Sequence, residues 1–298
     1  MPDEIEVPIE VDAATYAYLM KQAAPTPKRE GSSRKQLAKR AEDPTITQAR
    51  QQMKAAVLHF LTAIATKTAA AILGSEKVAK GKDEELAALL RRIPIIQGDG
   101  LVPDLADPLR TIAKAGGARA LVELEITDKQ MLSDVNEVAS DWADSRAAEM
   151  VGMRRLKSGR LVQNPQAQWT ISDKTRDDLR DIVTDAFEKK TGMNELADEI
   201  QQAGTFSEYR AHTIAATETI RAENQGNLAG WHTSGQVLEL DWLLSADHDD
   251  STSDCECGDN ADGSPYPIDE VPELPAHPNC TCALVVARLV GQDEKGTA

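Results

Sequence analysis

The sequence predicts a mainly helical protein that ends in a smaller α+β domain. Aromatic residues make up only 4% of the 298 residues, and abundant Ala, Leu, Glu, Asp, Lys and Gln favour helices over a β-sandwich or barrel. Apolar residues recur at helical spacing along most of the chain. Only two segments near the C-terminus, 235–244 and 282–290, have the alternating or β-branched character of strands.

Residues 1–43 are expected to form a flexible arm, because they lack the apolar periodicity of a docked segment. The chain carries a net charge of −16, which excludes nucleic-acid binding over the whole surface, since phosphate contacts need clustered basic residues. The arm runs against this trend at residues 28–40. Its basic residues are Lys28, Arg29, Arg34, Lys35, Lys39 and Arg40. A disordered tail and an arm that contacts DNA or an acidic partner both fit this pattern.

Neither a signal peptide nor a membrane span is expected. The N-terminus is acidic and no apolar core follows it. No stretch approaches the ~20 apolar residues of a membrane span. We therefore expect no membrane partner, and synthesis in a reducing cytoplasm, where structural disulfides are uncommon.

A helical region is expected over residues 44–160. Its first helix ends near Gly74 and has an apolar stripe at helical spacing. The stripe consists of Met53, Val57, Phe60, Leu61, Ile64 and Thr68. A short helix is expected over 82–92, and two helical pieces are expected within 105–126, separated by Gly116 and Gly117. A further helix follows, with one apolar face made by Leu132, Val135, Val138, Ala139, Trp142 and Met150.

A domain boundary is expected at residue 160, because Gly159 and Pro165 interrupt the helical pattern. The domain that follows, over 161–290, should begin with a helix capped by Ser172.

A capping box of Thr205 and Glu208 should then open a long helix, which leads into the two strands. The loop 245–285 lies between the strands, and residues 291–298 form a tail.

All the cysteines of the chain lie in that loop or at its end. They form two Cys-x-Cys pairs, Cys255 with Cys257 and Cys280 with Cys282, and His277 precedes the second pair. Zinc takes thiolates and imidazoles at tetrahedral corners, typically as two ligand pairs from two turns. The loop is acidic and poor in apolar residues, so a metal ion would supply the free energy that orders it. The sequence therefore predicts a structural zinc site with these five residues as candidate ligands.

Other chemistry stays open for the same loop. The thiols fit a disulfide or simply reduced side chains, and one thiol beside a base would fit a nucleophile. The segment "DNADG" fits a fragment of a calcium loop but lacks the acidic final ligand. His248 is a further metal donor or a solvated side chain.

Polar residues on the long helix form a second candidate group. Arg210, Thr217, Arg221 and Asn224 are spaced to share a face, and Glu218 can pair with Arg221 one turn on. Such residues form either a surface salt bridge or a polar network that ties the helix to the neighbouring strands and loop.

These segments together resemble a known family. The order "YRAHTIAATETIRAENQGNLAGW", a strand with Trp242, a Cys pair, Asp-Gly and "HPNCTC" is similar to the phage head morphogenesis family, typified by phage Mu F-like minor head proteins. The resemblance spans about residues 165–290. Its signature residues fall on Arg210, Thr217, Glu218, Asp262, Gly263, His277, Cys280 and Cys282. The chain departs from the family at Ala216, where an Arg is usual, and at the first Cys pair, which is commonly Cys-x-x-Cys.

The resemblance implies a non-enzymatic minor structural protein of a tailed-phage head, made in the bacterial cytoplasm and located in the virion. Its expected partners are the portal or major capsid protein, scaffold, and DNA through the basic arm, and Asp262 would join the polar network. The alternative is a metal-dependent DNA hydrolase that uses His277, His248 and Glu218.

Overall fold

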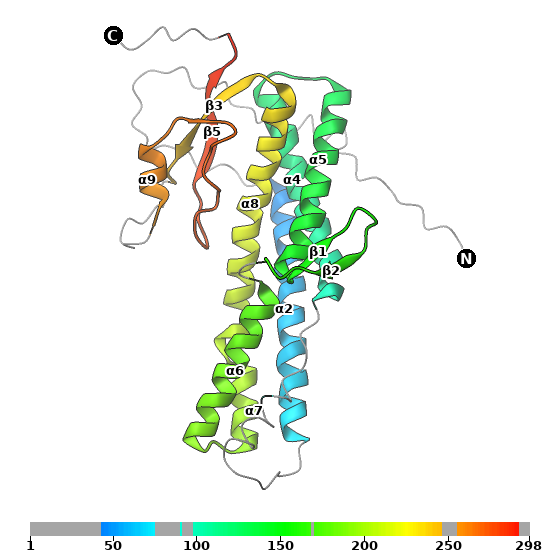
Figure 1. Cartoon of the computed structure of the whole chain (residues 1–298), viewed down its shortest axis with the longest axis vertical. Coiled ribbons are helices and arrows are strands. Elements are labelled where there is room, and N and C mark those ends of the chain that lie inside the picture. The colour runs from blue at the N-terminus through cyan, green and yellow to red at the C-terminus, as the bar shows by residue number, and fades with distance from the viewer. Residues whose placement is uncertain (1–42, 75–89, 91–97, 168–169, 246–254, 292–298) are drawn as a thin grey trace, which may run out of the picture. The chain divides into compact units, whose positions relative to one another are not determined.

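The computed structural model describes residues 43–74, 90, 98–167, 170–245 and 255–291. These residues form helices for the most part, with two small antiparallel sheets, and this confirms the predicted fold class (Figure 1). The elements are α2 (Pro44–Leu73), η1 (Asp99–Leu101), α4 (Val102–Glu123), α5 (Lys129–Met150), β1 (Met153–Arg155), β2 (Leu161–Gln163), α6 (Ile171–Lys189), α7 (Met193–Gln202), η2 (Gly204–Phe206), α8 (Glu208–Ser234), β3 (Val237–Leu243), α9 (Cys257–Asp262), β4 (Tyr266–Pro267) and β5 (Ala283–Leu289).

The chain divides into two compact units, and each unit combines separate segments. The first unit contains the described parts of 1–49, 109–143 and 216–298, and the second contains those of 50–108 and 144–215. The boundary expected at residue 160 falls inside the second unit, in the β1–β2 hairpin, so domains at 44–160 and 161–290 stay a prediction. The expected arm and tail lie almost wholly outside the described residues.

In the first unit, glycines bring the backbones of α4 and α8 into close contact. A Cβ added to Gly226 would lie 1.9 Å from the carbonyl oxygen of Ala113, and one added to Gly116 would lie 2.3 Å from that of Glu223. Only hydrogen fits at either position. The expectation that Gly116 and Gly117 separate two helices is therefore wrong: α4 continues through both, because the packing against α8 outweighs their low helix propensity.

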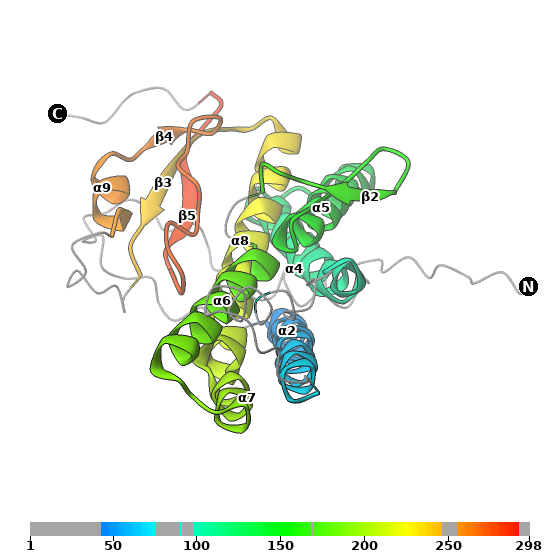
Figure 2. The same ribbon diagram turned by 60° about the horizontal axis from the view of Figure 1, so that its bottom comes forward.

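The C-terminal sheet has the strand order β4-β3-β5, and β3 pairs antiparallel with β5. Trp242 lies opposite Leu284 in this register. Their side chains pack with Leu240 and with Trp231 of α8 in one buried cluster, so the sheet lies beside α8 (Figure 2). Both predicted strands are confirmed, and the described part of the loop between them, 255–282, contributes buried side chains to this core.

In the second unit, the predicted apolar stripe of α2 is buried apart from Phe60, which is half-buried. An ion pair also joins α2 to the start of α8, because the ammonium of Lys54 lies 2.6 Å from the carboxylate of Glu208.

By length and composition, α2 is also apolar enough to cross a membrane, contrary to the expectation that no such stretch exists. The core helix of a soluble protein can have the same length and apolar composition, and α2 has the buried stripe of such a helix. Length and composition are therefore weak support for a membrane segment.

Two expected helix caps lie at other residues. Thr170 caps α6, because its hydroxyl accepts a hydrogen bond from the amide of Asp173 at 2.9 Å, whereas Ser172 is buried within the helix. Ser207 caps α8 through a 3.2 Å hydrogen bond from the amide of Arg210.

Candidate metal centre

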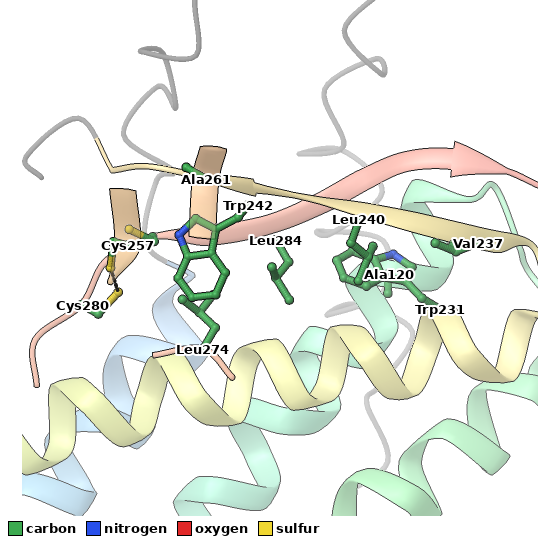
Figure 3. Packing of buried hydrophobic residues seen from close by; sticks show 11 residues of the cluster. Ala120, Trp231, Val237, Leu240, Trp242, Cys257, Ala261, Leu274, Cys280 and Leu284 are labelled. Atoms are coloured by element: carbon green, nitrogen blue, oxygen red, sulfur yellow. Dashed lines mark hydrogen bonds between the residues drawn. The ribbon is translucent and has the colours of Figure 1, made fainter. Parts of the chain in front are cut away.

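The two cysteine pairs meet where α9 begins and β5 starts. Cys255 and Cys257 lie at the first turn of α9, and Cys280 and Cys282 immediately precede β5. The sulfurs of Cys257 and Cys280 are 3.6 Å apart, although 23 residues separate them in the chain (Figure 3). His277 lies in the same place. We call these five residues the Cys/His cluster.

The donor atoms of the cluster form two triangles that share one corner. The sulfurs of Cys257, Cys280 and Cys282 all lie within 4.8 Å of one another, and so do the donor atoms of Cys255, Cys257 and His277. Cys257 belongs to both groups. The structure thus brings all five predicted candidates together around a single thiol.

His277 is oriented as a metal-binding histidine would be. Its Nδ1 lies 2.9 Å from the carbonyl oxygen of Pro278, which fixes the proton on Nδ1 and leaves a lone pair on Nε2. That Nε2 atom is buried and has no hydrogen-bond partner among the described residues. An imidazole nitrogen in this state can act as a ligand to a metal ion.

The thiols are free, since a separation of 3.6 Å exceeds the ~2.05 Å of a disulfide. Burial raises the pKa of Cys257, and the hydrogen bond that Cys282 shares with Cys280 raises the pKa of Cys282. The same hydrogen bond, accepted by Cys280, is the largest cause that lowers the pKa of Cys280 to about 5. These shifts favour the charged form at Cys280 over the charged forms at Cys257 and Cys282.

The turn that carries His277 and Cys280 is also held by α8. The amide of Asn279 donates a hydrogen bond to the hydroxyl of Thr217 at 3.0 Å. Four residues ahead of His277, the carboxylate of Glu273 forms an ion pair with the guanidinium of Arg221.

The same guanidinium contacts a second carboxylate, because its Nε lies 3.4 Å from the buried carboxylate of Glu218. Glu218 and Arg221 are thus paired one turn apart, and Thr217 and Arg221 both contact the segment that leads to Cys280. Asn224 instead donates to the carbonyl of Ile220 in its own helix at 2.8 Å, and Asp262 is the last residue of α9.

Residues 177–285 match the family model described as phage Mu protein F like protein. This segment belongs to the phage Mu F-like family. The family suggests a role in phage head morphogenesis for the protein that contains this segment. No curated protein and no solved structure matches the chain.

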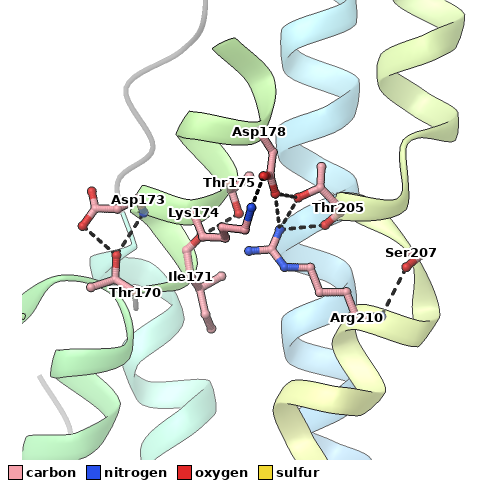
Figure 4. Close-up of polar contacts among 9 residues, drawn as sticks. All are labelled: Thr170, Ile171, Asp173, Lys174, Thr175, Asp178, Thr205, Ser207 and Arg210. Atoms are coloured by element: carbon pink, nitrogen blue, oxygen red, sulfur yellow. Dashed lines mark hydrogen bonds and ion pairs between the residues drawn. The ribbon is translucent and has the colours of Figure 1, made fainter. Parts of the chain in front are cut away.

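The Mu F-like domain contains the whole Cys/His cluster and the polar residues of α8, and the match begins in α6. The matched segment also includes Asp178, a residue that the sequence did not single out. Asp178 of α6 accepts hydrogen bonds from the hydroxyl of Thr205 and from the ammonium of Lys174 (Figure 4). The i, i+4 spacing of Lys174 and Asp178 was the only local signal for it.

Arg210 contacts this group and not the turn that carries Cys280. Its guanidinium donates to the carbonyl of Thr205 at 2.8 Å and lies 3.8 Å from the carboxylate of Asp178. Burial lowers the pKa of Arg210. Burial alone would raise the pKa of Asp178, but the hydrogen bonds from Lys174 and Thr205 and the nearby positive charges outweigh it, so that pKa lies below its ordinary value. The candidate network is therefore two groups, one that joins Arg210 to Thr205 and Asp178 and one that joins Thr217 and Arg221 to Asn279 and Glu273.

The remaining predicted residues, His248 and the basic residues of 28–40, lie outside the described residues. Glu273 and Asn279 were missed because their partners are more than fifty residues away in the sequence.

Proposed function

We propose that the protein is a minor structural component of a tailed-phage head, which joins the portal or the major capsid protein during assembly. The match of residues 177–285 to the phage Mu F-like family carries this proposal. The helices of the N-terminal half would provide the surface for these partners, and the Mu F-like domain would be a compact module with a structural metal. In a mature phage the protein would lie in the head near the portal.

A structural role fits the chemistry of the site better than a hydrolase does. A catalytic zinc needs an open coordination position and a nearby base. Here the donor atoms of four other residues lie close to the Cys257 sulfur, and the thiols of Cys257, Cys280 and Cys282 are buried. Glu218, the candidate base, lies 3.4 Å from the guanidinium of Arg221 and is itself buried.

The basic arm would add a contact to packaged DNA or to scaffold. Its six basic residues at 28–40 stand against a single Glu30, whereas the whole chain is strongly acidic. Deleting residues 26–40 should weaken any binding to DNA and reduce its dependence on salt. If the salt dependence of binding stays the same after the deletion, the arm does not contact DNA.

Mass spectrometry of purified heads tests the proposal directly. Heads from the phage that encodes this chain should contain it at a low and fixed ratio to the major capsid protein, and heads made without it should assemble defectively. Purified heads and procapsids that lack the protein would contradict a structural role. Cleavage of DNA by the purified chain, lost in a folded Glu218→Ala variant, would favour the hydrolase instead.

A further inference from the structure

We propose that Cys257, Cys280, Cys282 and His277 bind one zinc ion as a closed, four-ligand structural site. This inference rests on the geometry of the Cys/His cluster and not on the virion role, so either proposal can fail alone. Cys255 would be an outer neighbour of the site and not a ligand.

The sulfur positions suit a tetrahedral ion. Two thiolates bound to zinc at about 2.3 Å lie roughly 3.8 Å from each other at tetrahedral angles. The sulfurs of Cys257 and Cys280 are 3.6 Å apart, and Cys282 is within 4.8 Å of both. Three buried thiolates could not share this space without a cation, because their like charges would repel in a medium of low dielectric constant.

The donor atom of His277 lies within 4.8 Å of the Cys257 sulfur, in the group that also contains Cys255, and its unsatisfied nitrogen makes His277 the candidate for the fourth position. Nε2 is buried without a hydrogen-bond partner in the described part of the chain, while Nδ1 is held by the carbonyl of Pro278. This second contact is the usual way in which a protein fixes the tautomer of a metal-binding histidine. Cys255 and His277 are both half-buried, so burial does not separate them, and the unpartnered Nε2 atom is what favours His277.

The donor set indicates which metal is bound. Three thiolates and one imidazole suit zinc, whereas magnesium and calcium prefer oxygen ligands. No carboxylate belongs to the donor groups found among the described residues. An ion with four protein ligands keeps no position for water, so the site would stabilise the fold and would not catalyse hydrolysis.

The ion would join parts of the chain that have little packing of their own. The six residues of α9 and the two of β4 are too short to be stable as independent elements. Zinc would tie the first turn of α9 to the residues that enter β5. Binding energy would thereby become folding energy for the Mu F-like domain.

The test uses the full chain, expressed in zinc-supplemented medium and purified with a reductant. Elemental analysis should find about one zinc per chain. Replacement of zinc by Co²⁺ should give an intense thiolate-to-metal charge-transfer band and the visible bands of a tetrahedral ion. A chain that contains no zinc, whose four thiols react freely with a thiol reagent or are joined in disulfides by intact mass, would overturn the proposal.

Matched variants decide the ligand set. Cys255→Ser should keep zinc with an affinity within about threefold of the parent chain, whereas His277→Ala should weaken binding by 10-fold or more. Cys280→Ser should lose the ion. If Cys280→Ser does not fold, the Co²⁺ spectrum of the unmodified chain still reports the number of thiolates. Loss of zinc in Cys255→Ser with full retention in His277→Ala would overturn the assignment of the fourth ligand.

Discussion

The backbone amide of Asn279 donates a hydrogen bond to the hydroxyl of Thr217 at 3.0 Å, across 62 residues of sequence. Asn279 has a φ of +59°, a left-handed conformation that Asn adopts more readily than most residues. Together these features fix the turn that carries His277 and Cys280 on the surface of α8. Thr217 thus holds the turn next to the candidate metal centre.

Thr217→Val should destabilise the domain by about 1 kcal/mol, because the shape of the side chain is kept while the acceptor for the Asn279 amide is lost. Thr217→Ser is the matched control and should cost less, since it keeps the hydroxyl. Urea unfolding gives the free energies, and hydrogen exchange of the Asn279 amide reports the bond itself. Equal exchange rates in the two variants would show that this hydrogen bond does not hold the turn.

Arg221→Met should cost more stability than Glu273→Gln. The guanidinium serves two carboxylates, and removing it deprives the buried Glu218 of a positive neighbour. We expect a loss of roughly 2 kcal/mol for Arg221→Met, and less than about 1 kcal/mol for Glu273→Gln, whose carboxylate is exposed. The comparison uses thermal unfolding at low and high salt. A larger loss of stability in Glu273→Gln than in Arg221→Met would contradict the view that Arg221 serves both carboxylates.

Gly226→Ala should separate α4 from α8. The new methyl group would meet the backbone of Ala113, which cannot rotate away, so we expect a loss of about 1–3 kcal/mol. Gly258→Ala, in α9, is the control, because a Cβ there has nothing within 4 Å. It should be neutral or stabilising by up to about 1 kcal/mol, as helix propensity predicts.

Fluorescence of the buried Trp231 and Trp242 follows the unfolding of both glycine variants. Similar stabilities for Gly226→Ala and Gly258→Ala would mean that the helices do not approach as closely as described.

Stability should fall in acid partly through Asp178. The pKa of this carboxyl lies below its ordinary value of 3.8 in the folded chain, so the folded state favours the charged form. The contribution is therefore present above the ordinary pKa and is lost as the pH falls through the lower, folded value. Asp178→Asn should lower stability near neutral pH by about 1 kcal/mol and make its acid dependence shallower.

Asp185→Asn is the control for Asp178→Asn, because Asp185 pairs with Lys189 on an exposed helix surface. It should lower stability near neutral pH by less than Asp178→Asn does, because an exposed ion pair contributes little. An equal loss of stability in the two variants would argue against a special role for Asp178.

Local sequence signals predicted those features of the fold that depend on neighbours in the chain. The alternating residues around Trp242 and the β-branched run before Leu289 indicated β3 and β5, and the clustering of Cys and His indicated where donor atoms would meet. The stripe of α2 was likewise visible, since a buried helix face repeats every 3.6 residues.

Features that depend on distant partners were not visible. Gly116 looked like a break, because nothing local reveals that Glu223 of α8 lies against it. Arg210 shares helical spacing with Thr217, yet its partners come from the segment before α8 and from α6. The roles of Asp178 and Glu273 depend on contacts that only the folded chain creates.

The zinc site is the central claim, and X-ray absorption at the zinc edge of the purified full chain tests it most directly. We predict a first shell of about three sulfurs near 2.3 Å and one nitrogen near 2.0–2.1 Å. No zinc edge in protein kept reduced, or a first shell made only of oxygen and nitrogen, would contradict the claim.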